Sequence, residues 1–229
     1  MDRTKSLSLR GIYFRRRFFI LFVSLLALIL VTPLVQGFVG IHIVWNIFFT
    51  GILLSGVHAV SEKRQNVYIA SLLALPMLVS MWSIYFVESN YLVIVGYLCG
   101  VLFFAYMIVN ILFFIYRQDK VTRDLIAGAA VVYLLMAMMW TFIYGVLEIA
   151  HPGSFTISAT DIHERMRFLY FSLVTITTLG YGDIVPKTSL ASSLATIEAV
   201  VGQLYLVTTV AWLVGVRVSQ SRERANCSD

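Results

Sequence analysis

The sequence predicts an all-α integral membrane protein with six transmembrane helices and a short re-entrant helix between the fifth and the sixth. Composition is the first observation: the 229 residues are 59% hydrophobic and 13% charged, whereas a soluble domain has about 45–50% apolar and about 25% charged residues. The second is that apolar stretches of membrane-spanning length recur along the chain, with the charged residues grouped between them. The mean hydropathy of +0.86 agrees with this class.

The predicted spans follow from length, because a helix needs about 20 apolar residues to cross a bilayer. A further apolar stretch at 168–177 is too short to span and leads directly into a glycine-rich segment. The first stretch follows three arginines, as in a signal peptide, but it is too long and no Ala-x-Ala cleavage site follows it. We therefore expect six spans, at residues 18–36, 39–60, 67–87, 91–116, 125–149 and 190–216.

The distribution of lysine and arginine predicts which ends of these spans face the cytoplasm. With six spans, 14 basic residues fall on the side of the two termini, and only Arg165, Arg167 and Lys187 fall on the other side. The positive-inside rule makes the first side cytoplasmic, so both termini are expected there and the glycine-rich segment opens outward. The net charge of +5 reflects this topology, and we expect no nucleic-acid partner.

The glycine-rich segment at residues 177–183 has the sequence TTLGYGD. Thr-x-Gly-Tyr-Gly-Asp is the signature of a potassium-channel selectivity filter, in which rings of backbone carbonyls from four chains replace the water shell of K⁺. Carbonyls that point the same way require alternating right- and left-handed backbone, which glycine adopts at low cost, and this explains Gly180 and Gly182. We expect K⁺ ligands from the carbonyls of Thr178, Leu179, Gly180 and Tyr181, and from the Thr178 hydroxyl.

Residues 125–217 comprise this filter, the short helix before it and a span on either side, and they resemble the pore module of tetrameric potassium channels. The resemblance is closest to bacterial six-span members of the voltage-gated-like superfamily, and it includes the stretch FSLVT at residues 171–175. It implies a C4 homotetramer whose central pore is lined by the last span. It also implies K⁺ as the bound ion, no organic cofactor, membrane lipids as neighbours and a location in the bacterial inner membrane.

Three residues near the filter in the sequence are candidates for supporting it. Asp183 matches the acidic residue just outside the filter of these channels, where four carboxylates would raise the local cation concentration. It could also form a hydrogen bond behind the filter. Tyr170 and Phe171 fall where related channels carry aromatic residues that support the filter tyrosine, although generic aromatic packing explains them equally well.

The last span contains candidates for gating and for lining the cavity. Gly202 lies where related channels place a hinge glycine, and a glycine in the middle of a helix permits bending. Close helix packing is the alternative, because glycine is common in membrane helices. Gln203, Leu206 and Val210 follow at helical spacing and are expected to line the cavity, although Gln203 could instead form an interhelical hydrogen bond.

Glu198 is an acid inside a predicted span, where an ionisable residue is costly and indicates a function. Its position in the last span places it level with the filter rather than with the inner end of the pore. Four such side chains would crowd the pore axis if they pointed inward. We therefore expect Glu198 to face the short helix and to support the filter through Thr175, Thr177 or a buried water.

The fourth span predicts a weak response to voltage. Voltage sensing requires about three to four charges per subunit along one helix, and residues 91–116 contain no lysine or arginine. Only a short tail follows the last span, so we also expect no cytoplasmic ligand domain. The expected organisation is a basic cytoplasmic N-terminus (1–17), a voltage-sensor-like four-helix domain without gating charges (18–116), a cytoplasmic linker (117–124), a pore domain (125–217) and a cytoplasmic tail (218–229).

Together these features predict a potassium-selective channel that conducts passively and is insensitive to voltage. Two alternatives stay open: a non-conducting or regulatory channel subunit, and a weakly selective cation channel, which would require a disrupted Gly-Tyr-Gly. An enzyme is not indicated, because the sequence contains no phosphate-binding loop, no zinc-ligand spacing and no nucleophile elbow.

Overall fold

The structure of the chain is a computed structural model that describes residues 17–34, 41–60, 64–83, 90–118, 120–157 and 166–226. The predicted basic N-terminus lies outside the described residues except for Arg17. Within these ranges the chain is almost entirely helical. The elements are α2 (Arg17–Leu34), α3 (Ile41–Ala59), α4 (Arg64–Ser83), α5 (Asn90–Tyr116), α6 (Arg123–Ala150), β1 (Phe155–Ile157), α7 (Arg167–Ile176), β2 (Ile184–Pro186) and α8 (Ser189–Asn226).

The helices follow the apolar stretches of the sequence closely, with the largest difference at the end of α8. The predicted span stops at residue 216, but the helix continues through Asn226 and has 38 residues. Residues 217–226 are mostly Arg, Ser, Gln, Glu and Ala. Several of these residue types are good helix formers in water, so the helix continues beyond the end of the apolar pattern.

The helices differ in how clearly they qualify as membrane spans. Among the described residues, four helices are long and apolar enough to cross a bilayer: they are α4, α5, α6 and α8. The described apolar parts of α2 and α3 are shorter, at Arg17–Val31 and Asn46–Ala59. The chain is therefore an integral membrane protein, and the count of six spans stays a prediction.

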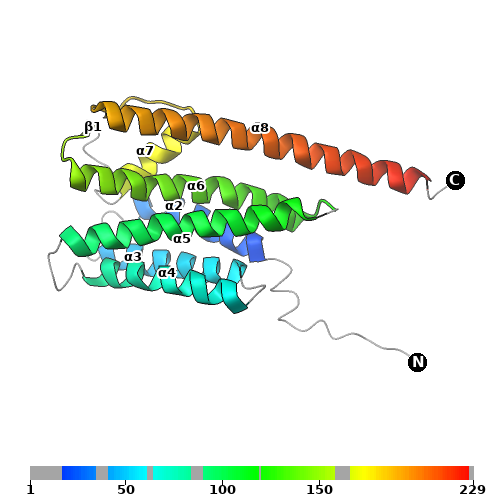
Figure 1. The fold of residues 1–229 in the computed structure, drawn as a ribbon, viewed down its shortest axis with the longest axis horizontal. Coiled ribbons are helices and arrows are strands. Elements are labelled where there is room, and N and C mark those ends of the chain that lie inside the picture. The colour runs from blue at the N-terminus through cyan, green and yellow to red at the C-terminus, as the bar shows by residue number, and fades with distance from the viewer. Residues whose placement is uncertain are drawn as a thin grey trace.

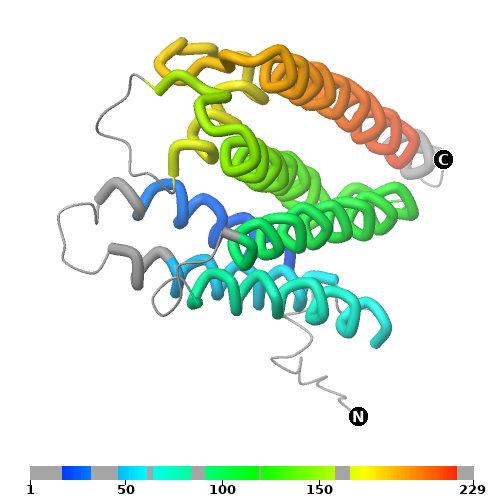
Figure 2. The backbone as a smooth tube through the Cα atoms, turned by 60° about the vertical axis from the view of Figure 1, so that its left-hand side comes forward, coloured from blue at the N-terminus to red at the C-terminus, as the bar shows by residue number. Residues whose placement is uncertain are grey.

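α6 lies at the centre of the molecule. It packs against α2 and α5 on one side and against α7 and α8 on the other. Figures 1 and 2 show α2 to α5 as a four-helix unit beside α6, with α7 held between α6 and the long α8. This arrangement leaves the short helix α7 enclosed by two long helices, and it fixes the position of the segment that follows α7.

Aromatic side chains join the four-helix unit to α6. Phe142 of α6 stacks on Phe104 of α5, with ring centroids 5.6 Å apart. Its ring also meets Phe49 of α3 at 6.0 Å and Tyr97 of α5 at 5.4 Å, both edge to face. Such aromatic pairs contribute about 0.5–1.5 kcal/mol each beyond the area they bury. The cluster therefore anchors α3 and α5 to the middle of α6.

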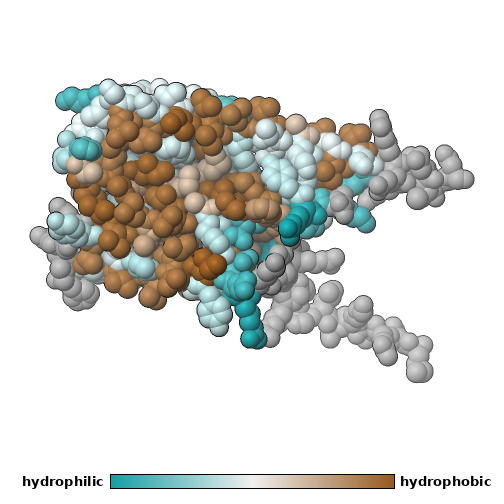
Figure 3. Space-filling model, viewed as in Figure 1, coloured by the Kyte–Doolittle hydropathy of each residue, from teal (hydrophilic) through white to brown (hydrophobic). Residues whose placement is uncertain are grey.

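One end of the bundle is polar. Hydrophobic residues form a broad belt over the face shown in Figure 3, and hydrophilic residues gather where α5 ends and α6 begins. Basic residues of this polar end include Arg117 and Arg123. At the same end Thr122 caps α6, because its side chain accepts a hydrogen bond of 3.2 Å from the backbone N–H of Leu125. The polar end is the side for which the sequence predicts a cytoplasmic location.

Candidate ion-binding segment

The segment 177–183 begins at the C-terminal end of α7 and is tied to it by backbone hydrogen bonds. Thr178 N–H donates to the carbonyl of Thr175 over 2.9 Å, and Leu179 N–H donates to the carbonyl of Val174 over 2.9 Å. These bonds satisfy carbonyls that would be left without partners at the end of a helix. The aligned peptide dipoles of α7 give its C-terminal end a partial negative charge, so this location favours a cation.

The backbone of the segment alternates in handedness. Thr178, Gly180 and Gly182 have φ angles of 59°, 61° and 78°, in the left-handed region, while Leu179 and Tyr181 do not. Glycine adopts this region freely, but Thr178 is the single described non-glycine residue with positive φ. Such a conformation costs roughly 1–3 kcal/mol and is typical of functional sites. The alternation is the geometry that a row of parallel carbonyl ligands requires.

The side chains of the segment are left uncovered by the single chain. Leu179 is 55% exposed and Tyr181 is 67% exposed. The predicted cavity residues Gln203, Leu206 and Val210 are also exposed. They lie on a face of α8 that neither α6 nor α7 covers in the single chain. The predicted ligand and cavity positions are thus uncovered in the single chain.

Tyr170 and Asp183 are joined directly. The Tyr170 hydroxyl donates to Oδ2 of Asp183 over 2.5 Å, and Oδ1 accepts from the backbone N–H of Ile184 over 3.0 Å. The bonds link the middle of α7 to the residue that ends the filter motif. Both carboxylate oxygens of Asp183 therefore have partners, and its support of the filter stays a prediction.

Phe171 lies elsewhere, although it is the neighbour of Tyr170 in sequence. It is buried against Tyr144 of α6 and Phe155 of β1, with ring centroids 5.1 Å and 5.3 Å away. Successive residues of a helix point about 100° apart, so two neighbours face different surroundings. Phe171 therefore packs behind α7, and a direct role beside Tyr181 stays a prediction.

Glu198 is fully buried where three helices meet. Its carboxylate accepts hydrogen bonds from the hydroxyl of Tyr144 in α6 and from the hydroxyl of Ser172 in α7. The Ser172 hydroxyl also lies 2.9 Å from the carbonyl of Ala137 in α6. Glu198 thus contacts the short helix α7 through Ser172, and α6 through Tyr144, rather than through Thr175 or Thr177. Its support of the filter stays a prediction.

Sequence reasoning missed Tyr144 and Ser172, for which a weak signal exists. Each is a hydroxyl within an apolar helix, and a buried hydroxyl needs a hydrogen-bond partner.

The sequence analysis also missed the contacts that hold the chain on either side of α7. There β1 and β2 pair antiparallel, with Thr156 opposite Val185. Glu148 at the end of α6 accepts from the N–H groups of Gly153 and Ser154 over 2.8 Å and 3.0 Å.

At Gly202, α8 packs closely against α7. A Cβ atom there would lie 2.4 Å from Cγ1 of Ile176 and 3.2 Å from the carbonyl oxygen of the same residue. The helix continues through Gly202 without interruption. Close packing is therefore a sufficient reason for this glycine, and its role as a gating hinge stays a prediction.

We expect Gly202→Ala to destabilise the packing of α8 on α7. Ile176 is fully buried, so its side chain has little room to move, and overpacking costs typically about 1–3 kcal/mol. The measurement is the thermal unfolding temperature of the purified protein in detergent. Gly215→Ala is the matched control, because no atom lies within 4 Å of a Cβ at Gly215. Equal unfolding temperatures for the two variants would contradict the expectation.

Residues 120–216 match the sequence profile of a protein family described as ion channel. The matched range includes α6, α7, the segment 177–183 and most of α8. The fold and this match together define the class: an integral membrane protein whose C-terminal half is similar to ion channels.

Two curated relatives are potassium channels. Two pore potassium channel c of Oryza sativa subsp. japonica is 45% identical over 71 residues, which is 30% of this chain and 14% of that protein. The inward rectifier potassium channel Kirbac3.1 of Paramagnetospirillum magnetotacticum is 38% identical over 72 residues, which is 31% of this chain and 21% of that protein. The chain therefore spans a small fraction of the length of either relative.

Proposed function

We propose that this protein is a potassium-selective channel that conducts K⁺ passively through a pore formed by four identical chains. The observation that carries the proposal is the alternating left-handed backbone at Thr178, Gly180 and Gly182, at the C-terminal end of α7. In a ring of four, the carbonyls of residues 178–181 replace the water shell of K⁺. The ion itself is the only bound group that the mechanism needs.

The uncovered side of the chain supports a homotetramer. In the apolar span of α6, 50% of the residues are buried within the chain. In the apolar span of α8, only 11% of the residues are buried. Leu206 and Val210, which are 36% and 56% exposed, lie on α8 with Gln203. In a C4 assembly these three residues line the cavity on the cytoplasmic side of the filter. Gly202, which directly precedes Gln203, is a candidate gating hinge.

The proposed placement in the membrane has six spans, with α7 as a re-entrant helix that does not cross. Both termini face the cytoplasm, since the end of α5 and the start of α6, which carry basic residues, lie at the same polar end of the bundle. Helices α2 to α5 form a four-helix domain, surrounded by lipid, beside the channel domain. The bacterial inner membrane is the location that the resemblance favours.

Reconstituted protein is expected to conduct K⁺ in strong preference to Na⁺. The test is the reversal potential in a planar bilayer with KCl on one side and NaCl on the other, with protein-free bilayers as the control. A potential displaced far toward the K⁺ equilibrium value supports the proposal. A reversal potential near zero would instead indicate a weakly selective cation channel, and no current at all would favour a non-conducting subunit.

Open probability is expected to change little with voltage. One charge moved across the membrane contributes about 2.3 kcal/mol per 100 mV, and α5 contains no lysine or arginine between Asn90 and Tyr116. Recording single channels from about −100 to +100 mV tests this expectation. A steep curve, equivalent to several gating charges per tetramer, would contradict it.

A further inference from the structure

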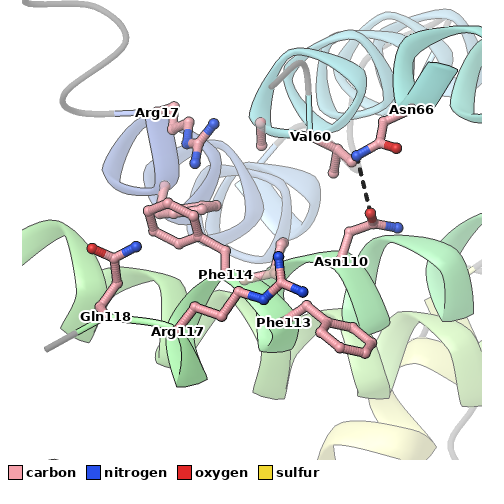
Figure 4. A pocket seen from close by; sticks show the side chains of 11 residues that line it. Arg17, Val60, Asn66, Asn110, Phe113, Phe114, Arg117 and Gln118 are labelled. Atoms are coloured by element: carbon pink, nitrogen blue, oxygen red, sulfur yellow. Dashed lines mark hydrogen bonds between the residues drawn. The ribbon is translucent and has the colours of Figure 1, made fainter. Parts of the chain in front are cut away.

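We propose that the polar end of the four-helix unit contains a binding site for a phosphate-bearing anion, occupied by the headgroup of an anionic membrane lipid. The site is a cavity of about 320 Å³ between α2, α3, α4 and α5. Figure 4 shows Arg17 and Arg117 directed toward it from α2 and from the end of α5, with Asn66 and Asn110 beside them. The channel mechanism uses none of these four residues.

The charge of the cavity is positive. Among the described residues that line it, two are arginines, three are amides and none is acidic. Two helices begin at the cavity and two end there, so their dipoles largely offset one another. The sign of the electrostatic potential in the cavity is therefore determined by the guanidinium groups. Asp124 of α6 lies near enough to Arg17 to interact with it electrostatically, but it is not part of the lining. Arg117 is therefore expected to be the main source of attraction.

The two arginines are held in an orientation suited to an anion. The Arg17 side chain is only 4% exposed, and its guanidinium lies over the rings of Phe18 and Phe114, at 4.7 Å and 4.5 Å from their centroids. Arg117 lies over Phe113 at 5.7 Å. A guanidinium that stacks through its face donates hydrogen bonds from its edge, and the edge matches the oxygens of a phosphate.

The amides add a further donor. Nδ2 of Asn66 donates to Oδ1 of Asn110 over 3.1 Å, and Nδ2 of Asn110 donates to the carbonyl of Tyr106 over 2.8 Å. An amide NH₂ group carries two hydrogens, so Asn66 has a second N–H in addition to the one that it gives to Asn110. This pair positions a neutral donor beside the two cations.

Two features favour a lipid over soluble phosphate. The cavity lies at the predicted cytoplasmic end of the spans, where the headgroups of anionic lipids gather. Phe113 lines the cavity and is 61% exposed, so an apolar surface for an acyl chain adjoins the charged site. The cavity volume is at the lower end of the range for small-molecule sites. It therefore suits a headgroup phosphate and its glycerol but not a whole lipid.

Occupancy would bear on the channel domain through the chain's connectivity. α5 ends at Tyr116 and α6 begins at Arg123, and Arg117 and Gln118 of the connection line the cavity. A lipid held there contacts the segment that joins the four-helix unit to the channel domain.

The test is binding of short-chain lipids to the purified full chain in detergent, which does not depend on conduction. Dioctanoyl phosphatidylglycerol is expected to bind well, and dioctanoyl phosphatidylcholine and inorganic phosphate at least about tenfold more weakly. Arg117→Gln should weaken phosphatidylglycerol binding about tenfold, because it removes a charge-assisted contact. Arg123→Gln is the matched control: it removes the same charge at the same end but outside the cavity, and it should leave the affinity unchanged.

Gln118→Glu is a second variant that keeps both arginines and the size of the side chain. It places a negative charge in the cavity and should also weaken phosphatidylglycerol binding, even if Arg117→Gln does not fold. Equal weakening by Arg117→Gln and Arg123→Gln would overturn the site, since it would indicate diffuse attraction to a basic surface. Equal affinity for the two lipids would overturn the proposal that the site selects an anionic headgroup. Equal affinity for inorganic phosphate and phosphatidylglycerol would overturn the proposal that the occupant is a lipid.

Discussion

Replacing Glu198 with alanine is expected to lower the heat stability of the assembled protein and to shorten its openings, with a smaller effect on single-channel conductance. Glu198 is the acceptor for Tyr144 and Ser172. After the change Ser172 retains the carbonyl of Ala137 at 2.9 Å, but the described bond of the Tyr144 hydroxyl is lost. A buried donor without a partner costs about 1–3 kcal/mol, and this cost recurs in each chain of a tetramer.

Variants of the same cluster make the test specific. Glu198→Gln preserves size and one acceptor, so its effect should be in the same direction but smaller. A double-mutant cycle with Tyr144→Phe measures the coupling between the two groups, which should be clearly different from zero. Thr196→Ala, at an exposed position of the same helix, is the control and should behave as the unmodified protein. Conductance that fell sharply while stability and open times stayed constant would instead place Glu198 in the pore.

Gly180→Ala is expected to reduce selectivity for K⁺ strongly or to abolish current. Gly180 has φ +61°, and no atom lies within 4 Å of a Cβ built there, so the backbone conformation rather than space excludes a side chain. A left-handed conformation costs roughly 1–2 kcal/mol for alanine. Since about 1.4 kcal/mol corresponds to a factor of ten in an equilibrium, each chain would leave the conductive geometry about tenfold more often.

Gly153→Ala is the matched control for this change. Gly153 also has a left-handed φ, +82°, and also has no atom within 4 Å of a Cβ, but it lies in the turn after α6. The same strain there should lower thermal stability slightly and leave the K⁺/Na⁺ permeability ratio unchanged. A permeability ratio in Gly180→Ala equal to that of the unmodified protein would rule out segment 177–183 as the selective element.

The sequence by itself determined the features that contiguous residues encode. Apolar stretches of sufficient length predict helices in a bilayer, and the described helices coincide with them to within a few residues, except at the end of α8. The chemistry of the segment 177–183 belongs to its own backbone, so seven neighbouring residues were enough to predict where left-handed glycines occur. The packing of the first four helices against α6 could not be predicted in the same way.

Only the tertiary structure decided how distant residues meet. Glu198 contacts residues 26 and 54 positions away, and Gly202 owes its close contact to Ile176 of another helix. The partners of Tyr170 and Phe171 are also distant in sequence: Asp183 for the first, and Tyr144 and Phe155 for the second. These contacts depend on the rotation and register of α8 against α6 and α7. Side chains packed from all three helices set that register together, and no single stretch of sequence encodes it.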